Sequence, residues 1–351
     1  MGTLELSDIN PTDIFNGYQV ILRSDSKLMS KNQLELIKAR LDSHEKWLST
    51  EGKDGQRFQA RNEDFRGVDF MHRDLSRAEF AMCNFYLSTF HDAKMKETRF
   101  FDCGFDKTLF TSAVFINATL SVTHLRYCNF YKSILNGCSI VPGQGLSVQL
   151  FTDAQVNDFS GCEMISCNIS GLNLSETVFA KAKIGALNFS DCKIRSADFS
   201  QTEIINPLYF SNCNLAGANF RGAKLGATKF SRCALIRSDF SNIQASGLIF
   251  QGGDISYAIF NGAQMPKSTL GMVSAQGTIF QLSDINNTEM RLCNFRFADF
   301  RNCSMYGSDL SGSDLQAAKI DNTTNKNMVN FTACIWIDGR TCANESIGIC
   351  H

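Results

Sequence analysis

The most constraining feature of this chain is an apolar residue that recurs at every fifth position. From Phe65 to Ile320, nearly all of these positions, which we call centres, hold Phe, Leu, Ile or Met. A small residue stands two positions before most centres, and Asn or Asp often stands directly before them. A period of five fits neither the 3.6 residues of a helical turn nor the 2.0 of a strand. The chain must therefore turn after each unit, which predicts a solenoid.

A chain that turns every five residues closes a four-sided coil after twenty. We expect each centre and each small residue to point inward, and the other three residues of a unit to face water. Residues 65–80, 211–230 and 301–315 show the unit clearly, and with it the chain resembles the pentapeptide-repeat family over roughly residues 60–320. The resemblance implies an all-β fold, a right-handed quadrilateral parallel β-helix. About 13 coils, stacked ~4.8 Å apart, give a rod roughly 60 Å long.

Phenylalanine follows the same period. From Phe210 to Phe240 the centres alternate between Phe and Leu, so two opposite faces should carry Phe, with opposed rings filling the axis. All but six of the 29 Phe stand at centres; the exceptions are Phe15, Phe58, Phe101, Phe151, Phe297 and Phe331.

The period is interrupted twice, each time beside a proline, Pro142 or Pro207. The first interruption leaves the next secure centre, Phe159, one residue short of the period, and the second adds one residue. Proline cannot donate a hydrogen bond to a strand ladder. We interpret residues 141–158 and 205–209 as loops that leave the rod, with a tolerated irregularity as the alternative.

The two ends are predicted to close the solenoid. Residues 30–48 are expected to form an amphipathic helix that begins with a capping box of Ser30 and Gln33 and covers the first coil. His44 lies on its apolar stripe and is interpreted as a contact with that coil rather than a catalytic base. The chain thus divides into an N-terminal segment, 1–55, the repeats, 56–322, and a C-terminal capping tail, 323–351.

Fourteen cysteines would ordinarily indicate disulfides or a metal site. Eleven of them stand two residues before a centre, where a buried Cys acts as a small apolar residue. We therefore expect free thiols and a reducing compartment. In the tail, Cys342 and Cys350 are a candidate disulfide, with zinc ligation near His351 or plain capping as alternatives. The eleven are Cys83, Cys103, Cys128, Cys138, Cys162, Cys167, Cys192, Cys213, Cys233, Cys293 and Cys303.

The net charge of −1 is small, but residues 181–237 hold an excess of positive charge. This basic band could attract phosphates or an acidic protein surface, or it could be a solvated face of mixed charge. No aromatic-rich nucleic-acid signature accompanies it, so direct nucleic-acid binding is not predicted. The band comprises Lys181, Lys183, Lys193, Arg195, Arg221, Lys224, Lys229, Arg232 and Arg237.

Enzyme motifs are absent: there is no GxSxG, P-loop, HExxH, or GxGxxG after a strand. His72, His91 and His124 fall in different units, so we expect no catalytic set. A filled prism also offers no concave pocket. Neither a cofactor nor a membrane-spanning segment is predicted, and with no export signal in the first residues the expected location is the cytoplasm, although secretion without a classical signal stays open.

Binding is the remaining class of function. We predict a non-catalytic protein-interaction scaffold, with a homodimer through the C-terminal coils as one use of its surface. The family resemblance implies an alternative, a resistance protein that mimics DNA and binds DNA gyrase, but the near-neutral rod argues against it. A secreted bacterial effector is a third alternative. Five apolar residues at outward positions of the last coils form the predicted partner surface, unless they are scattered surface residues: Tyr257, Met272, Leu292, Phe297 and Tyr306.

Overall fold

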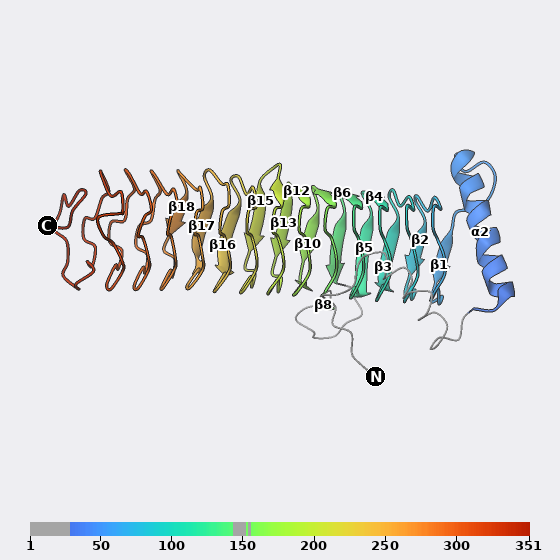
Figure 1. The fold of residues 1–351 in the computed structure, drawn as a ribbon. Coiled ribbons are helices and arrows are strands. Elements are labelled where there is room, and N and C mark those ends of the chain that lie inside the picture. Colours follow the sequence, from blue (N-terminus) through green and yellow to red (C-terminus); the bar gives the residue numbers. More distant parts are fainter. Residues whose placement is uncertain (1–28, 143–151, 154–155) are drawn as a thin grey trace, which may run out of the picture.

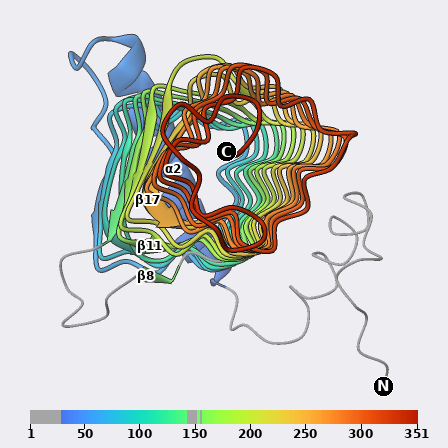
Figure 2. The ribbon, with the colours of Figure 1, turned by 90° about the vertical axis from the view of Figure 1, so that its left-hand side faces the viewer.

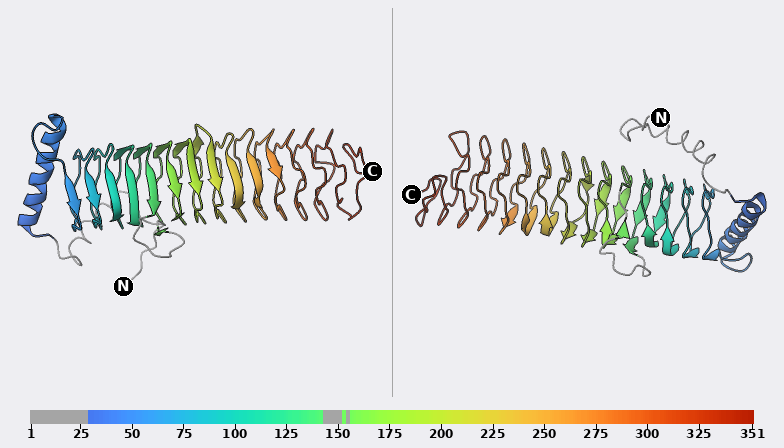
Figure 3. Two further views of the ribbon diagram at one scale, coloured as in Figure 1. Left: turned by 180° about the vertical axis from the view of Figure 1, so that it is seen from behind. Right: turned by 90° about the horizontal axis from the view of Figure 1, so that it is seen from below.

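The computed structural model describes residues 29–142, 152–153 and 156–351. In this part of the chain, parallel strands stack into one elongated rod, with the helix α2 (Lys31–Ser49) across one end and the C terminus at the other (Figure 1). Viewed along the rod, successive coils superimpose around a common axis (Figure 2). Two further views show the same stack from behind and from below (Figure 3). The predicted all-β solenoid with a helical cap is confirmed.

Short strands mark three of the faces, and isolated parallel bridges continue the ladders where no strand is assigned. One face holds an eleven-stranded sheet: β1 (Gln59–Arg61), β2 (Glu79–Ala81), β3 (Arg99–Gly104), β5 (Thr119–His124), β7 (Ser139–Pro142), β10 (Asn168–Ser170), β13 (Leu187–Ser190), β15 (Leu208–Ser211), β16 (Lys229–Ala234), β17 (Ile249–Asp254) and β18 (Thr269–Gly271). A five-stranded sheet contains β4 (Val114–Ile116), β6 (Ile134–Asn136), β9 (Glu163–Ile165), β12 (Lys183–Gly185) and β14 (Glu203–Ile204). A third pair is β8 (Thr152–Asp153) with β11 (Leu172–Asn173).

The pairing register gives the length of each coil. Phe80 pairs with Phe100, twenty residues on, so a regular coil contains four pentapeptides. Ser139 pairs with Asn168, 29 residues on, so the first interruption adds nine residues. Within the predicted loop 141–158, β8 still pairs with β11, and residues 143–151 lie outside the described residues.

The second interruption is smaller. Phe189 pairs with Phe210, 21 residues on, so one residue is added between the two coils. Ile205, beside Pro207, is exposed at this point, and Phe210 is again a buried centre. The added residue is therefore accommodated within a single coil.

A column of stacked phenylalanine rings forms the core. Twelve centres, from Phe70 to Phe300, stack with successive ring centroids 4.4 to 5.2 Å apart. A second Phe column faces it across part of the rod, and the two meet edge to face, as Phe230 and Phe240 do at 5.9 Å and 86°. Aromatic pairs favour these two geometries. Opposed rings thus fill the axis, as the alternation of Phe and Leu predicts.

The small inward positions hold buried thiols. All twelve free cysteines are buried. Cys138 Sγ, for example, donates to the carbonyl oxygen of Phe115 at 3.3 Å, and burial raises the pKa of this thiol to about 12. Cys83 and Cys103 occupy the same inward position on adjacent coils, and their thiols donate to the carbonyl oxygens of Ala81 and Phe101, each at 3.4 Å. The position of these twelve cysteines in the repeat therefore explains them as small buried packing residues.

Helix α2 covers the first coil. It begins with the capping box, in which the Ser30 hydroxyl accepts from the backbone N–H of Gln33. His44 is fully buried beneath the helix, stacked on Trp47 with ring centroids 5.7 Å apart. His44 Nδ1 accepts a hydrogen bond from the backbone N–H of Phe58 at 3.0 Å. This contact joins the cap to the start of the first coil.

Parallel pairing extends beyond residue 322, where the predicted repeats end. Asn325 bridges to Ser304, and two further bridges also join residues 21 positions apart, so one residue is inserted after Ile320. Phe331, which the period alone excludes from the centres, is then a buried centre. This last coil does not follow the five-residue period, because a single residue is inserted before it.

The chain then folds back over its own last coil. Two antiparallel bridges, one of them between Ile335 and Thr341, form this closing segment. The Cys342 and Cys350 sulfur atoms are bonded at 2.10 Å. Together these contacts cover the end of the solenoid opposite α2.

Candidate functional site

Residues two positions after a centre form the edges of the rod, and we call these edge positions. The same position in the next coil lies directly beside it, because the coils are in register. The backbone at an edge position is left-handed: φ is 61° at Arg77, 57° at Glu97 and 53° at Asn117. Edge side chains therefore project from a fixed turn in a row along the rod.

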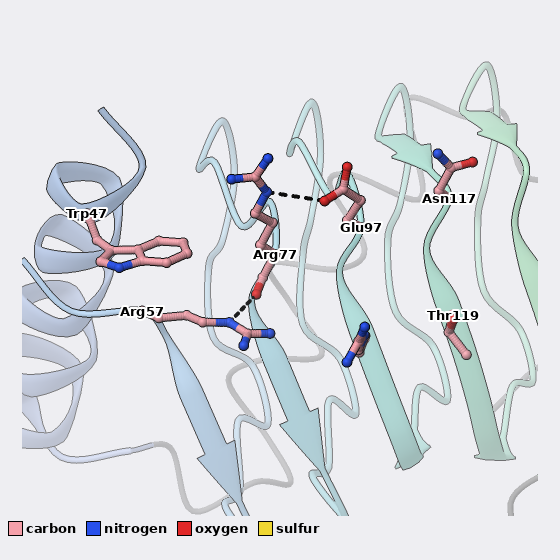
Figure 4. A pocket seen from close by; sticks show the side chains of 7 residues that line it. Trp47, Arg57, Arg77, Glu97, Asn117 and Thr119 are labelled. Carbon is pink, nitrogen blue, oxygen red and sulfur yellow. Dashed lines mark hydrogen bonds and ion pairs between the residues drawn. The ribbon is translucent and has the colours of Figure 1, made fainter. Parts of the chain in front are cut away.

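A hollow of about 500 Å³ lies between α2 and the first coils, and we call it the cap groove (Figure 4). Trp47 projects from the helix toward the edge row (Figure 4). The other lining residues come from that row and from the neighbouring strands. The full lining is Trp47, Arg57, Arg77, Glu97, Arg99, Asn117 and Thr119.

Three guanidinium groups give the cap groove its charge. Arg57 lies 3.3 Å from Glu79, and its Nε donates to the carbonyl oxygen of Arg77 at 2.5 Å. Arg77 Nε lies 3.1 Å from Glu97 Oε2. Arg99 is exposed and forms no ion pair with any residue that the structure describes. The groove thus carries one guanidinium without a compensating carboxylate.

Sequence reasoning did not find the cap groove. Its signal was present, since Arg57, Arg77, Glu97 and Asn117 stand at intervals of twenty and so form one row. The position of Trp47 had no comparable signal, because the pentapeptide period stops before the helix.

Two of the three histidines predicted to lie apart come together on an edge. His91 Nδ1 lies 2.7 Å from Thr111 Oγ1, and His91 Nε2 lies 3.2 Å from Asp92 Oδ2. His72 Nδ1 lies 3.6 Å from the same carboxylate oxygen. Hydroxyl, imidazole and carboxylate stand in the order of a hydrolytic triad, but acyl transfer also requires donors for an oxyanion and a substrate cavity. We assign no reaction to this edge.

A metal centre has no support in the described residues. Among them, no group of three or more His, Cys, Asp or Glu side chains is arranged to hold a metal ion. Within the same residues, no helix is both long enough and apolar enough to cross a membrane.

The predicted partner surface is spread over several edges. Met272 and Leu292 are exposed on one edge, one coil apart, and Tyr257 and Phe297 lie on the next edge, two coils apart. Tyr306 is exposed as well, but it directly follows the centre Met305 on another face of the coil, and Gly307 holds the edge position there. The five residues therefore do not form one continuous patch.

The basic band surrounds the rod. Lys183 and Lys224 lie on the face of the five-stranded sheet, with Glu203 between them in the ladder. Lys229 belongs to the eleven-stranded sheet, and Lys193 bridges to Asn173 on a further face. Its charges are thus distributed around the coil rather than gathered on one surface.

Similarity to known whole proteins is low. No curated protein matches the sequence. Among solved structures, a trypsin-treated form of QnrB1, described as a plasmid-mediated fluoroquinolone resistance protein, is 19% identical with a TM-score of 0.38, covering 49% of this chain and 89% of its own. HetL, a pentapeptide-repeat protein involved in heterocyst differentiation regulation from the cyanobacterium Nostoc sp. strain PCC 7120, is 16% identical with a TM-score of 0.20, covering 84% and 96%.

The family comparison is the more informative one. The model for pentapeptide repeats matches in eight copies, over residues 103–140, 158–201, 209–242, 278–316 and 288–324. Its matches coincide with the parallel twenty-residue coils described above. On this sequence pattern and this architecture, the chain belongs to the pentapeptide-repeat family.

Proposed function

We propose that this protein is a non-catalytic scaffold in the cytoplasm that binds a protein partner through its outer surface. The stacked Phe column fills the axis, which leaves the faces and edges as the surface for recognition. Membership of a family of repeat scaffolds supports the same class of function. The twelve inward free thiols are in keeping with a reducing compartment, whereas the Cys342–Cys350 disulfide is not.

The observation that carries this proposal is the presence of bulky apolar residues at edge positions. Met272 and Leu292 have φ values of 55° and 56°, and 65% and 63% of each residue is exposed. A left-handed backbone costs a residue with a side chain roughly 1–2 kcal/mol, and Gly or Asn adopts it more readily. Burial does not offset this cost at an exposed edge. Contact with a partner gives these side chains a role that neither packing nor backbone preference gives.

The test replaces both residues with Asn, which suits a left-handed edge. We expect the Met272→Asn/Leu292→Asn variant to fold with equal or greater stability and to lose the partner that the wild-type protein retains. Affinity purification from cells that express the protein, followed by a direct binding measurement with the purified partner, gives the comparison. A matched control, Lys267→Asn, changes an edge residue that is already polar. Equal affinity of the partner for the double variant and for the wild-type protein would refute the proposal.

The gyrase alternative requires a surface that repeats the negative charge of DNA. The net charge of −1 and the basic residues around the coil do not provide one. We therefore expect that the purified protein at micromolar concentration neither inhibits gyrase nor protects it from a fluoroquinolone in a supercoiling assay. Either effect would favour the alternative over a scaffold for another partner.

A further inference from the structure

We propose that the cap groove binds an acidic peptide segment of a protein partner, with one peptide carboxylate on Arg99 and a neighbouring apolar side chain against Trp47. This inference rests on the proposed scaffold function and adds the chemistry of one partner. It concerns the end of the rod that α2 covers, far from the coils beyond β18 to which Met272 and Leu292 belong, so the two sites can be tested separately.

The charge of the cap groove selects an anion. Arg57 and Arg77 are each paired with a carboxylate, whereas Arg99 is exposed on β3 without one among the described residues. A guanidinium presents a planar fork of donors that matches a carboxylate with two parallel hydrogen bonds. Thr119 lies beside Arg99 in the ladder, paired in register one coil further on, and adds a hydroxyl at the same place.

Trp47 supplies a fixed apolar wall. Its ring stacks on His44 with an interplanar angle of 15°, and Figure 4 shows the indole extending from α2 toward Arg77. A partly buried side chain that is already held in place loses little conformational freedom on binding. Tryptophan and arginine are the residue types that most often dominate the energetics of protein interfaces.

The same groove disfavours a nucleic acid. Glu79 and Glu97 place two carboxylates among the three guanidinium groups. Binding to a nucleic acid depends on several phosphate contacts along the backbone, and these carboxylates would repel neighbouring phosphates. One uncompensated guanidinium fits a single carboxylate better than a polyanion.

The spacing of the coils sets the distance between the two anchoring side chains of the peptide. Arg99 lies two coils further along the rod than Arg57, which corresponds to about 10 Å at a strand spacing of ~4.8 Å. In a polyproline II segment, residues three apart lie on the same side and about 9.3 Å apart, at ~3.1 Å per residue. In the proposed peptide, an aromatic residue three positions before Glu therefore covers the length from Arg57, which lines the groove together with Trp47, to Arg99.

The experiment uses the full chain with Trp336→Phe, so that Trp47 is its remaining tryptophan. The probe is the peptide acetyl-Gly-Phe-Pro-Pro-Glu-Gly-amide, and its matched control has Gln in place of Glu. Binding is followed by Trp47 fluorescence and by calorimetry. We expect the Glu peptide to bind at least tenfold more tightly than the Gln peptide, and Arg99→Gln to remove this preference.

Arg61→Gln is the matched protein control, because Arg61 is also an exposed strand arginine of the first coils but does not line the groove. Equal affinity for the two peptides, equal losses in Arg61→Gln and Arg99→Gln, or no binding at millimolar peptide would each overturn the proposal. Displacement of the peptide by inorganic phosphate or duplex DNA at equal concentration would also overturn it, by showing a general anion site.

The outcomes separate this inference from the proposed function. Peptide binding that depends on Arg99, together with the absence of any protein partner in cells, would leave the groove chemistry standing and remove the scaffold role. A partner that is lost in the Met272→Asn/Leu292→Asn variant, without peptide binding at Arg99, would do the reverse.

Discussion

Removing one ring from the phenylalanine column tests what holds the rod together. Phe240 is fully buried and contacts four other rings: Phe220 and Phe260 stack on it at 4.7 and 4.8 Å, and Phe230 and Phe250 meet it edge to face at 5.9 and 5.8 Å. Each aromatic pair contributes about 0.5 kcal/mol or more beyond the area it buries. Phe240→Leu keeps most of the apolar volume and loses all four pairs, so the free energy of unfolding should fall by about 2 kcal/mol.

Phe300, near the end of the same column, provides the comparison. It contacts two rings, Phe280 and Phe295, at 5.1 and 5.4 Å. Phe300→Leu should therefore cost about 1 kcal/mol, half the loss at Phe240. Urea unfolding is measured by circular dichroism and by tryptophan fluorescence, because the coils of a solenoid can unfold in parts. Equal losses in the two variants would refute the additive role of ring pairs.

Three further predictions concern the loop, the cap and the thiols. Deleting residues 143–151 shortens the 29-residue coil to twenty, so the variant should be at least as stable in urea unfolding, and a loss above about 2 kcal/mol would contradict this. Burial lowers the pKa of His44 from 6.5, against the opposing charges of Asp74 and Glu45, so the unfolded state binds its proton more tightly. Stability should fall as the pH drops below 6.5, and less in His44→Gln, whose amide can still accept from Phe58; parallel pH profiles would refute this. Because burial raises the pKa of thiols such as Cys138 to about 12, a thiol reagent at pH 8 should label native protein slowly and all twelve free cysteines after denaturation, and rapid native labelling would contradict the packing.

The five-residue period predicts most of the fold, because each centre specifies one inward position. The column from Phe70 to Phe300 follows directly from counting in fives. Counting in fives does not predict the last coil, because one inserted residue after Ile320 moves Phe331 out of phase. The unit itself survives there, in the order Val329, Asn330, Phe331, and allowing one slip would have recovered it.

The candidate sites were harder to predict, because they join rows that the sequence separates. Met272 and Leu292 are twenty apart, so counting in fives predicts their shared edge, whereas Tyr306 is assigned to its face only by following the faces around the coil. His72 and His91 are nineteen apart and fall in different units, yet a corner of the coil brings both to Asp92. The cap groove required the packing of α2, which depends on contacts such as that of His44 with Phe58 and not on any period.

The left-handed edges separate the positions that specify the fold from the positions that face solvent. Centres and small inward residues specify the fold, while edge side chains such as Met272, Arg77 and Leu292 project outward from a left-handed backbone at a cost of only about 1–2 kcal/mol each. Such positions can be exchanged, in evolution or in the laboratory, without disturbing the buried interior. Substitutions at the edge positions can thus give the solenoid new binding specificities, with one residue per coil along each edge. The hydrophobic interior stays unchanged.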